Sequence, residues 1–288
     1  MPNRNLCLTP GDPQGIGPEV TVKFITRHLH RYPDLHLDVI GSLSALHPQV
    51  TCIDNDPYQA IETAVQRMAD KKADALVTGP ITKRHGGGHT EILETLARKL
   101  YPNVSSKAEM LFVHHNFRLL LLTRHIPLHE ISGALTPSAC EASLEILIHF
   151  LHTRFGIAMP RIAVLGVNPH AGEIGGQEES EILIPVLNRL NHKNQAHLEG
   201  PFAADGFFRG FKAETPGYDA IVAPYHDQGL IPFKLIAGHQ AVNVTIGLPF
   251  IRTSVGHGTA FDIAGQGIAD ESGLVAAIDT ALQLLDAL

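Results

Sequence analysis

Short apolar runs alternate along the chain with longer segments in which apolar residues recur at helical spacing. Runs of this length predict buried strands, and strands that alternate with helices predict an α/β fold with a largely parallel sheet. The predicted strands are Asn5–Leu8, Leu37–Ile40, Ala75–Thr78, Leu111–Val113, Leu119–Thr123, Ile162–Val167, Ala220–Ala223 and Val242–Ile246. The predicted helices include Pro18–His28, Tyr58–Asp70, Thr90–Leu100, Pro137–Phe155, Glu179–Leu190 and Ser272–Leu285.

The length and composition favour a protein of two domains. The chain has 288 residues, of which 44% are hydrophobic and 18% charged, so a large core can form. At about 150 residues per domain, this length corresponds to two domains. Because no linker marks a boundary, we expect it to lie in ordinary crossovers. Residues 1–90 and 241–288 then form a terminal α/β domain with both chain ends, and residues 91–240 form a central α/β domain.

Charge and cysteine content narrow the class of protein further. The net charge of -7 argues against non-specific nucleic-acid binding, which needs a basic surface. The sequence has no apolar run long enough to span a bilayer and no secretory signal at its start. Three widely spaced cysteines without a CxxC pair disfavour a disulfide framework or a thiolate metal site. We therefore expect a cytoplasmic protein that binds neither nucleic acid nor membranes.

Three histidines, His125, His170 and His226, each come shortly after a predicted strand. Ligands of open α/β sheets bind beyond the carboxyl ends of the strands. Three neutral imidazoles can hold one divalent ion and leave positions open for substrate and water. The sequence therefore predicts an open metal site. Since the chain contains 18 histidines, the alternative is three unrelated loop residues.

A second group of residues is suited to bind an anion. Gly79-Pro80-Ile81-Thr82-Lys83 follows a predicted strand, and Gly86-Gly87-Gly88 precedes a predicted helix. Glycines let backbone N–H groups approach a ligand, and a helix N-terminus favours negative charge. Lys234, Asn243 and Arg252 could clamp a phosphate or a carboxylate. The alternative is a flexible turn and two surface charges.

Two further glycine-rich segments have no specific signature. Thr9–Glu19 is a strand-to-helix turn that matches neither G-x-G-x-x-G nor a P-loop, and His257–Gly265 is a polar loop before the last helix. By spacing alone, either segment could be a tight turn without a ligand. The sequence also lacks the G-x-S-x-G motif of serine hydrolases.

Seven blocks, in order along nearly the whole chain, match one known family. They are TPGDPQGIGPEV (9–20), VTGPITK (77–83), GHTE (88–91), LTRHIPL (122–128), NPHAGE (168–173), YHDQGLIPFK (225–234) and VNVTIGLPFIRTSVGHGTAFDIAG (242–265). With them the chain resembles the 4-hydroxythreonine-4-phosphate dehydrogenases of vitamin B6 (pyridoxine) synthesis. The first and last blocks also resemble isocitrate and isopropylmalate dehydrogenases. The resemblance implies their two-domain α/β fold with a cleft between the domains.

The resemblance also implies an activity. The enzyme would use NAD, or alternatively NADP, and a divalent metal (zinc, magnesium or cobalt). It would oxidise 4-phosphohydroxy-L-threonine to 2-amino-3-oxo-4-phosphooxybutanoate, which decarboxylates to 3-amino-2-oxopropyl phosphate. It would be a homodimer, formed by the central domain, with the active site at the subunit interface. The alternatives are a threonate or erythronate 4-phosphate dehydrogenase of the same family, a metal-dependent hydrolase, or a degenerate phosphate-binding protein.

The resemblance assigns roles to individual residues. The metal ligands, shared between partners, would be His125, His170 and His226. The substrate-binding residues would be His89, Thr90, Lys234, Asn243 and Arg252. The catalytic acid or base would be among Asp205, Asp227 and Lys234. The cofactor-binding residues would be Gly11, Asp12, His257, Gly258 and Asp262.

The chain departs from the family pattern in three ways. It is shorter than usual members, and the stretch between Ile40 and Tyr58 is compressed. A second compression lies between Lys83 and His89, next to the expected substrate-binding residues. Finally, Gly256 stands where the family usually has aspartate before His-Gly-Thr-Ala, which could alter contacts with the cofactor or the partner subunit.

Overall fold

The computed structural model describes residues 3–43, 47–82, 88–104 and 106–287. It divides into two units, Met1–Ala108 with His239–Asp286 and Glu109–Gly238, and each unit is described by itself. The predicted domain boundary at 90/91 falls at the start of α3 (His89–Leu100), a helix that packs within the first unit. The predicted division into functional domains stays a prediction.

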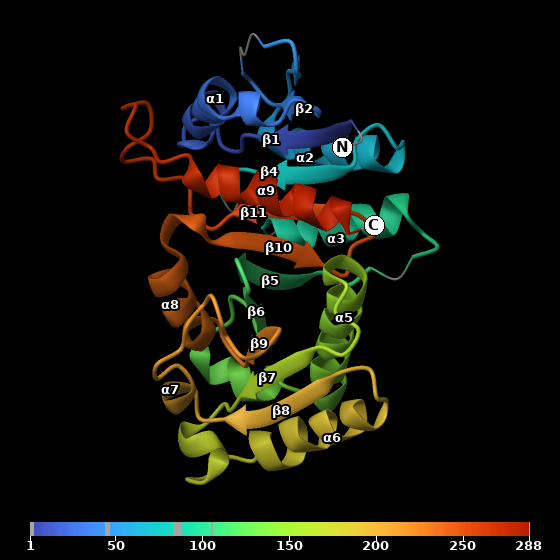
Figure 1. Cartoon of the computed structure of the whole chain (residues 1–288), viewed down its shortest axis with the longest axis vertical. Helices are drawn as coiled ribbons and strands as arrows, with labels where there is room; N and C mark the ends of the chain where they lie inside the picture. Colours follow the sequence, from blue (N-terminus) through green and yellow to red (C-terminus); the bar gives the residue numbers. More distant parts are fainter. Residues whose placement is uncertain (1–2, 44–46, 83–87, 105, 288) are drawn as a thin grey trace. The chain divides into compact units, whose positions relative to one another are not determined.

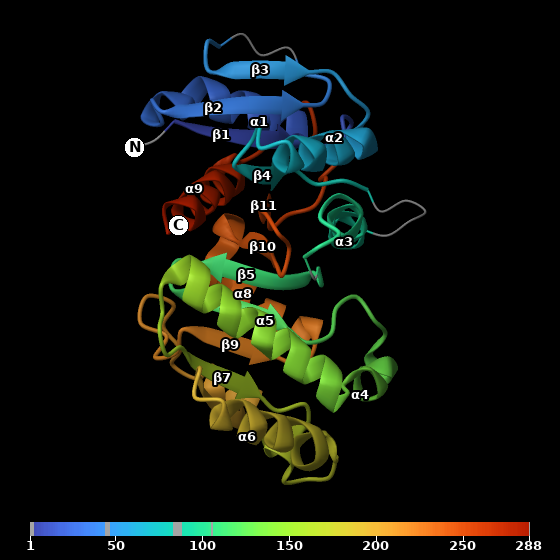
Figure 2. The ribbon, with the colours of Figure 1, turned by 90° about the vertical axis from the view of Figure 1, so that its right-hand side faces the viewer.

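The first unit is a mostly parallel sheet covered on both faces. Its strands lie in the order β3-β2-β1-β4-β11-β10, and all neighbours are parallel except the hairpin β10–β11. Helices α1 and α9 lie on one face, and α2 and α3 on the other (Figures 1 and 2). The bounds are β1 (Arg4–Thr9), α1 (Gly17–Arg27), η1 (Leu29–Arg31), β2 (Leu35–Ile40), β3 (Val50–Ile53), α2 (Pro57–Ala69), β4 (Ala75–Thr78), η5 (Gly238–Gln240), β10 (Val242–Ile246), β11 (Ile251–Val255) and α9 (Ser272–Asp286).

Local sequence signals and burial explain these elements. Asp56 caps α2 by accepting a hydrogen bond from the Tyr58 backbone N–H, and Pro57 occupies the first helical position. The apolar stripe of α2 meets that of α3, where Ile61 and Leu93 are fully buried. Each such side chain stabilises the unit by roughly 1.5–3 kcal/mol. All four residues of β4 are buried, as expected for a central strand covered on both faces.

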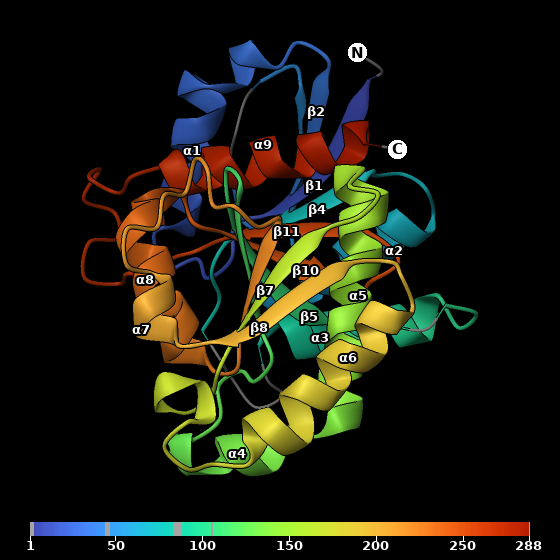
Figure 3. The same ribbon diagram turned by 60° about the horizontal axis from the view of Figure 1, so that its bottom comes forward.

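The second unit repeats this architecture with five strands. They lie in the order β5-β6-β9-β7-β8, and only the hairpin β5–β6 is antiparallel. Helix α8 lies on one side of β9 and β7, while α5 and α6 lie on the other (Figure 3). The bounds are β5 (Glu109–His114), β6 (Phe117–Leu121), η2 (Leu128–Glu130), α4 (Ile131–Ala134), α5 (Pro137–Phe155), β7 (Arg161–Leu165), η3 (Pro169–Gly172), η4 (Glu178–Leu183), α6 (Ile184–His192), β8 (His197–Phe202), α7 (Ala204–Phe207), β9 (Ala220–Ala223) and α8 (His226–Ala237).

The predicted α/β class is confirmed, and most differences concern strands that carry polar residues. Strands β4, β9 and β10 have the predicted bounds, as does helix α5. Strands β3, β8 and β11 were not predicted, because two of them lie at sheet edges and are partly exposed, and β11 contains arginine, threonine and serine. The predicted helix 179–190 divides into the π-helix η4 and α6. In the described residues, no helix has the length and apolar character needed to cross a membrane.

Candidate functional site

Three parallel strands of the second unit bring their carboxyl ends to one edge. Strand β9 pairs with β6 on one side and with β7 on the other. Beyond the strands, the Leu122 N–H donates to the Ala223 carbonyl at 3.0 Å. The Thr123 hydroxyl donates to the Pro224 carbonyl at 2.7 Å. The segments that lead to His125 and His226 therefore leave the sheet side by side, as the positions after the predicted strands had indicated.

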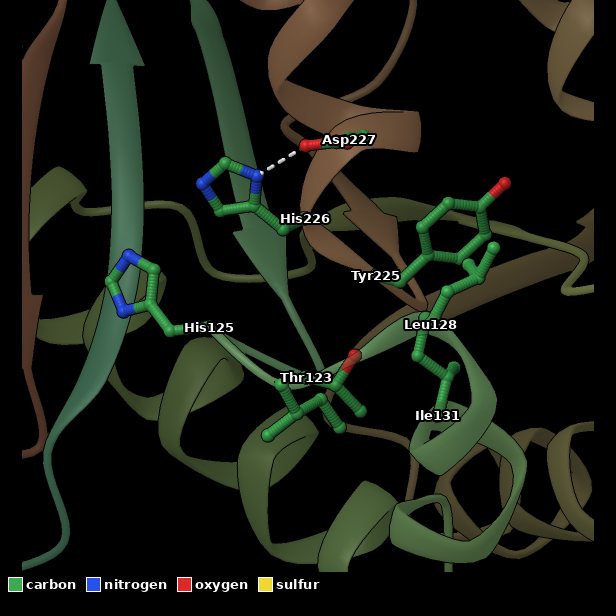
Figure 4. Close-up of a pocket in the computed structure, with 8 residues that line it drawn as sticks. Thr123, His125, Leu128, Ile131, Tyr225, His226 and Asp227 are labelled. Carbon is green, nitrogen blue, oxygen red and sulfur yellow. Dashed lines mark hydrogen bonds and ion pairs between the residues drawn. The ribbon is translucent and has the colours of Figure 1, made fainter.

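His125 and His226 lie next to each other in the lining of a small pocket. Their ring centroids are 5.5 Å apart (Figure 4). His226 Nδ1 lies 2.6 Å from Asp227 Oδ1, a hydrogen bond that fixes the ring and leaves Nε2 for a ligand. The pocket has a volume of about 220 Å³ and is lined by Thr123, His125, Ile126, Leu128, Ile131, Tyr225, His226 and Asp227.

His170 is placed differently. It lies in η3, just beyond β7, at the same edge of the sheet, but its side chain is exposed and does not line the pocket. Across the described ranges, no three His, Cys, Asp or Glu side chains form a group that could hold a metal ion. Within one chain, the structure thus brings together two of the three predicted metal ligands. Two imidazoles, one of them oriented by a carboxylate, are the donor chemistry that a divalent transition metal prefers.

His125 and His170, the two strand-end histidines that lie outside α8, have a left-handed backbone conformation. The φ angles are 50° at His125, 55° at His170 and 54° at Ala171. This conformation costs a residue other than glycine roughly 1–2 kcal/mol. Such residues cluster at functional sites, where the surrounding structure compensates for the strain.

The three candidates for the catalytic acid or base differ in position. Asp227 lines the pocket. Lys234 lies two turns further along α8 and Asp205 lies on α7; both are exposed, and neither lines the pocket. The helix α8 that carries Asp227 and Lys234 was not among the predicted helices.

In the first unit, Arg252 is a buried cation held by neutral partners. Its side chain is 1% exposed and donates to the hydroxyls of Thr245 at 2.8 Å and Thr78 at 2.6 Å. No carboxylate among the residues that the structure describes forms an ion pair with it, and its Nε has no hydrogen-bond partner there. Burial lowers the pKa of this guanidinium from 12.5 to about 9. A buried charge without a counter-ion is costly, so the arrangement fits an anionic ligand.

The other predicted substrate residues of this unit also have unsatisfied polar atoms. His89 begins α3, and burial together with the charge of Arg252 lowers the pKa of its imidazole well below 6.5. His89 Nε2 and Asn243 Oδ1 are buried and have no partner in the described part of the chain, and Thr90 is buried beside His89. Unpaired buried polar groups are rare in native proteins, and a bound ligand is one explanation for them. The glycine turn proposed to bind an anion lies mostly outside the described residues, as does Lys83.

The two loops of the predicted cofactor site meet in the first unit. The Ile16 N–H donates to the Thr259 carbonyl at 2.9 Å. Gly11 has a φ of 91°, and a Cβ there would come within 2.1 Å of the Pro80 carbonyl oxygen, so only glycine fits this turn. Asp12 accepts a hydrogen bond from the Thr82 hydroxyl at 2.7 Å.

The histidine loop has a buried polar atom of its own. His257 Nε2 is buried without a partner in the described ranges, and burial lowers the pKa of this imidazole. A Cβ at Gly256, where the family usually has aspartate, would lie 2.5 Å from the Ala241 carbonyl oxygen. The structure therefore has no room for that aspartate. Gly258 precedes Thr259, while Asp262 is exposed.

Sequence reasoning missed the hydroxyl groups around Arg252 and the apolar wall of the histidine pocket. Thr78 ends β4 and Thr245 lies opposite Arg252 in the β10–β11 hairpin. Thr78 could have been found as the last residue of a predicted strand. Thr245 required the unpredicted strand β11, whose pairing places it beside Arg252.

The fold first places the chain in a broad class, the proteins that share the fold of isocitrate dehydrogenase. The chain resembles isocitrate dehydrogenase from Methylococcus capsulatus with a TM-score of 0.59 and 14% identity, covering 99% of this chain and 87% of that one. This likeness confirms the predicted type of fold. The sequence then matches the family of pyridoxal phosphate biosynthetic protein PdxA over residues 49–281, and the chain belongs to this family.

Individual relatives agree with this assignment. A 4-hydroxythreonine-4-phosphate dehydrogenase from Synechocystis is 39% identical, over 98% of this chain and 95% of the relative. The structure of a 4-hydroxythreonine-4-phosphate dehydrogenase from Klebsiella pneumoniae has a TM-score of 0.81 and 29% identity, with 98% of each chain covered. The predicted family and oxidoreductase class are thereby confirmed. The family implies a nicotinamide cofactor and a phosphorylated small-molecule substrate.

The alignment with the Synechocystis protein extends over 338 positions, more than the 288 residues of this chain. The relative therefore contains internal segments that this chain lacks. This agrees with the compression expected from the sequence. Strand β3 nevertheless lies within the compressed stretch between Ile40 and Tyr58.

Proposed function

We propose that the protein catalyses the NAD-dependent oxidation of 4-phosphohydroxy-L-threonine at its C3 hydroxyl. The product, 2-amino-3-oxo-4-phosphooxybutanoate, loses carbon dioxide to give 3-amino-2-oxopropyl phosphate. The observation that carries the proposal is the buried Arg252 guanidinium, which within the described residues donates to two threonine hydroxyls and to no carboxylate. An anionic substrate supplies the charge that this cation lacks in the described structure.

Several side chains would share the binding of that anion. Thr78 and Thr245 hold the guanidinium in place, so little of its freedom is lost when the anion binds. His89 is kept neutral and can donate through Nε2, which has no partner among the described residues. Asn243 and Thr90 complete the set in the first unit. Lys234 lies in the second unit and stays a predicted substrate-binding residue. Because the phosphate is remote from C3, its binding energy serves to orient the reacting carbon.

A divalent ion is proposed at the three histidines. His125 and His226 supply two imidazoles on one pocket, and Asp227 orients the second of them. Because one chain assembles only two of the proposed ligands in its described residues, we propose that His170 completes the site in a homodimer. When bound, a zinc, magnesium or cobalt ion lowers the pKa of a coordinated hydroxyl and stabilises negative charge on its oxygen.

The proton and the hydride pass to different acceptors. We assign the proton of the C3 hydroxyl to Asp227, because it lines the histidine pocket and its Oδ2 accepts no hydrogen bond from the described residues. Asp205 and Lys234 are the alternatives. NAD, or NADP instead, would accept the hydride and would be held by Gly11, Asp12, His257, Gly258 and Asp262. The widely spaced cysteines fit a reducing compartment, and we place the enzyme in the cytoplasm.

The test is the rate of NADH formation by the metal-free protein and after addition of zinc, magnesium or cobalt. We expect metal-dependent turnover of 4-phosphohydroxy-L-threonine. Turnover of threonate or erythronate 4-phosphate in its place would assign the chain to the alternative dehydrogenases of the family. Metal-dependent phosphate release without NADH formation would indicate a hydrolase. Binding of the substrate without turnover under any of these conditions would indicate a degenerate phosphate-binding protein.

A further inference from the structure

The turn that carries His170 is wrapped around a buried carboxylate. Glu179 is 3% exposed, and its Oε1 accepts hydrogen bonds from the backbone N–H groups of Val167 and Asn168, both at 2.7 Å. Its Oε2 accepts a third, from Asn168 Nδ2 at 2.9 Å. All three donors belong to the segment between β7 and His170. The carboxylate therefore fixes the path by which the chain reaches this histidine.

The two glycines that flank the turn leave little space around this carboxylate. A Cβ at Gly166 would lie 3.2 Å from Glu179 Oε1, and one at Gly172 would lie 3.0 Å from Oε2. Between them, His170 and Ala171 both have φ angles in the left-handed region. Two consecutive residues other than glycine hold this conformation only where the surroundings impose it. The bonds to Glu179 hold the start of this segment, together with a hydrogen bond from Gln228 Nε2 to the Gly166 carbonyl at 2.7 Å.

The preceding residue, Glu178, links the same turn to the histidine pocket. Its Oε2 accepts a hydrogen bond from Asn168 Nδ2 at 2.9 Å, and its Oε1 accepts one from the Ser132 hydroxyl. Ser132 follows Ile131, which lines the same pocket as His125 and His226. A chain of hydrogen bonds thus runs from the pocket wall through Glu178 to the turn of His170.

The π-helix η4 explains how two successive residues reach one asparagine. In an α-helix, neighbouring side chains diverge by about 100° around the axis, so both would not be expected to bind the same group. Glu178 and Glu179 begin η4, whose wider turn ends at Leu183. Short π-helical segments occur frequently at functional sites.

We propose that Glu178 and Glu179 are positioning residues that hold His170 for its role as a metal ligand and tie its turn to the pocket wall. The inference rests on the proposed function, because it takes His170 to be a ligand. Glu179 sets the backbone of the turn, and Glu178 couples it to α4. Neither residue touches substrate or metal in this scheme, and groups of this kind usually affect metal affinity 10- to 100-fold.

The test compares Glu179→Gln with Glu181→Gln in the full-length protein. Glu181 lies in the same helix and is exposed, so its substitution removes the same charge without touching the turn. Cobalt binding to the metal-free protein is measured by calorimetry, and amide hydrogen exchange is followed at Val167 and Asn168. We expect Glu179→Gln to weaken cobalt binding roughly 10- to 100-fold and to speed exchange at both amides. Glu181→Gln should leave both measurements unchanged.

A second variant covers the case in which Glu179→Gln does not fold. Asn168→Ala removes the donor that both carboxylates share while the two backbone bonds to Glu179 remain. We expect it to weaken cobalt binding as well, in a protein that stays folded with a lower melting temperature because two hydrogen bonds to carboxylates are lost. Unchanged cobalt affinity in the folded variants would overturn the inference, as would absence of cobalt binding by the wild type. If the variants lose cobalt affinity but the wild type oxidises none of the substrates, the proposed function fails and the positioning role stands.

Discussion

Replacing Arg252 by methionine should leave the stability of the unliganded protein nearly unchanged while it abolishes tight substrate binding. Lowering the pKa of a guanidinium from 12.5 to about 9 by burial corresponds to about 5 kcal/mol of unfavourable free energy at neutral pH. The hydrogen bonds to Thr78 and Thr245 offset part of this, at about 1.5–3 kcal/mol each. Methionine removes both the penalty and the two bonds. Because the two bonds together are worth about 3–6 kcal/mol, the two effects nearly cancel. We therefore expect the free energy of unfolding without ligand to stay within about 2 kcal/mol of the wild-type value.

The same substitution should weaken the complex with the substrate much more strongly. Removing one partner of a buried ion pair costs about 3–5 kcal/mol. The dissociation constant of 4-phosphohydroxy-L-threonine should therefore increase roughly 10²- to 10³-fold. Urea unfolding with and without the substrate, together with calorimetry, measures both effects.

A matched control is available in the second unit. Arg118 is also buried, but its guanidinium lies 4.0 Å from the centre of the Phe155 ring and donates to the Asp219 carbonyl. Arg118→Met should reduce stability and leave substrate affinity unchanged. The reasoning is refuted if Arg252→Met binds the substrate like the wild type, or if it loses more than about 3 kcal/mol of stability without ligand, since Arg252 would then be a structural residue.

Three further predictions concern the second unit. His170→Ala and His226→Ala should each lose bound metal and turnover, while their circular dichroism spectra stay like that of the wild type. Metal content is measured by plasma emission spectrometry, and an unchanged content in both variants would contradict the proposed site. Hydrogen bonds from Ser132 and Asn168 lower the pKa of Glu178 from 4.5 to about 2, so its stabilisation is complete above pH 4.5 and is lost as the pH falls towards 2. Urea unfolding of wild type and Glu178→Gln should therefore differ most near pH 7 and least near pH 2, and a constant difference would disprove this. Gly229→Ala should lower the free energy of unfolding by about 1–3 kcal/mol, because the new Cβ would lie 2.8 Å from the Cβ of Ala223. Gly133→Ala has open space around its Cβ and should not lower the free energy of unfolding in the same assay.

Strand ends could be predicted well because their sequence signal is local. The run Ala220–Ala223 is short and apolar, and the structure forms a strand over the same residues. Its neighbour β6 ends two residues earlier than predicted, yet His125 still emerges beside His226. Parallel pairing carries the residues after both strands to one edge, whatever the precise strand end.

The elements that sequence reasoning missed depend on tertiary contacts. Helix α8 follows β9 after two residues and contains Pro232, which disfavours helix in isolation. It packs on the sheet through Gly229, a contact that no local pattern encodes. The position of His170 also depends on tertiary contacts, because Glu179 binds the backbone that leads to it, and its exposed side chain does not line the pocket of the other two histidines.

Simultaneous measurement of NADH and carbon dioxide tests the account most directly. The metal-loaded protein is supplied with NAD and 4-phosphohydroxy-L-threonine, and absorbance at about 340 nm and released gas are recorded together. Oxidation at C3 followed by decarboxylation predicts one carbon dioxide for each NADH, with both products absent when the metal is removed. Release of inorganic phosphate with neither product would contradict the account.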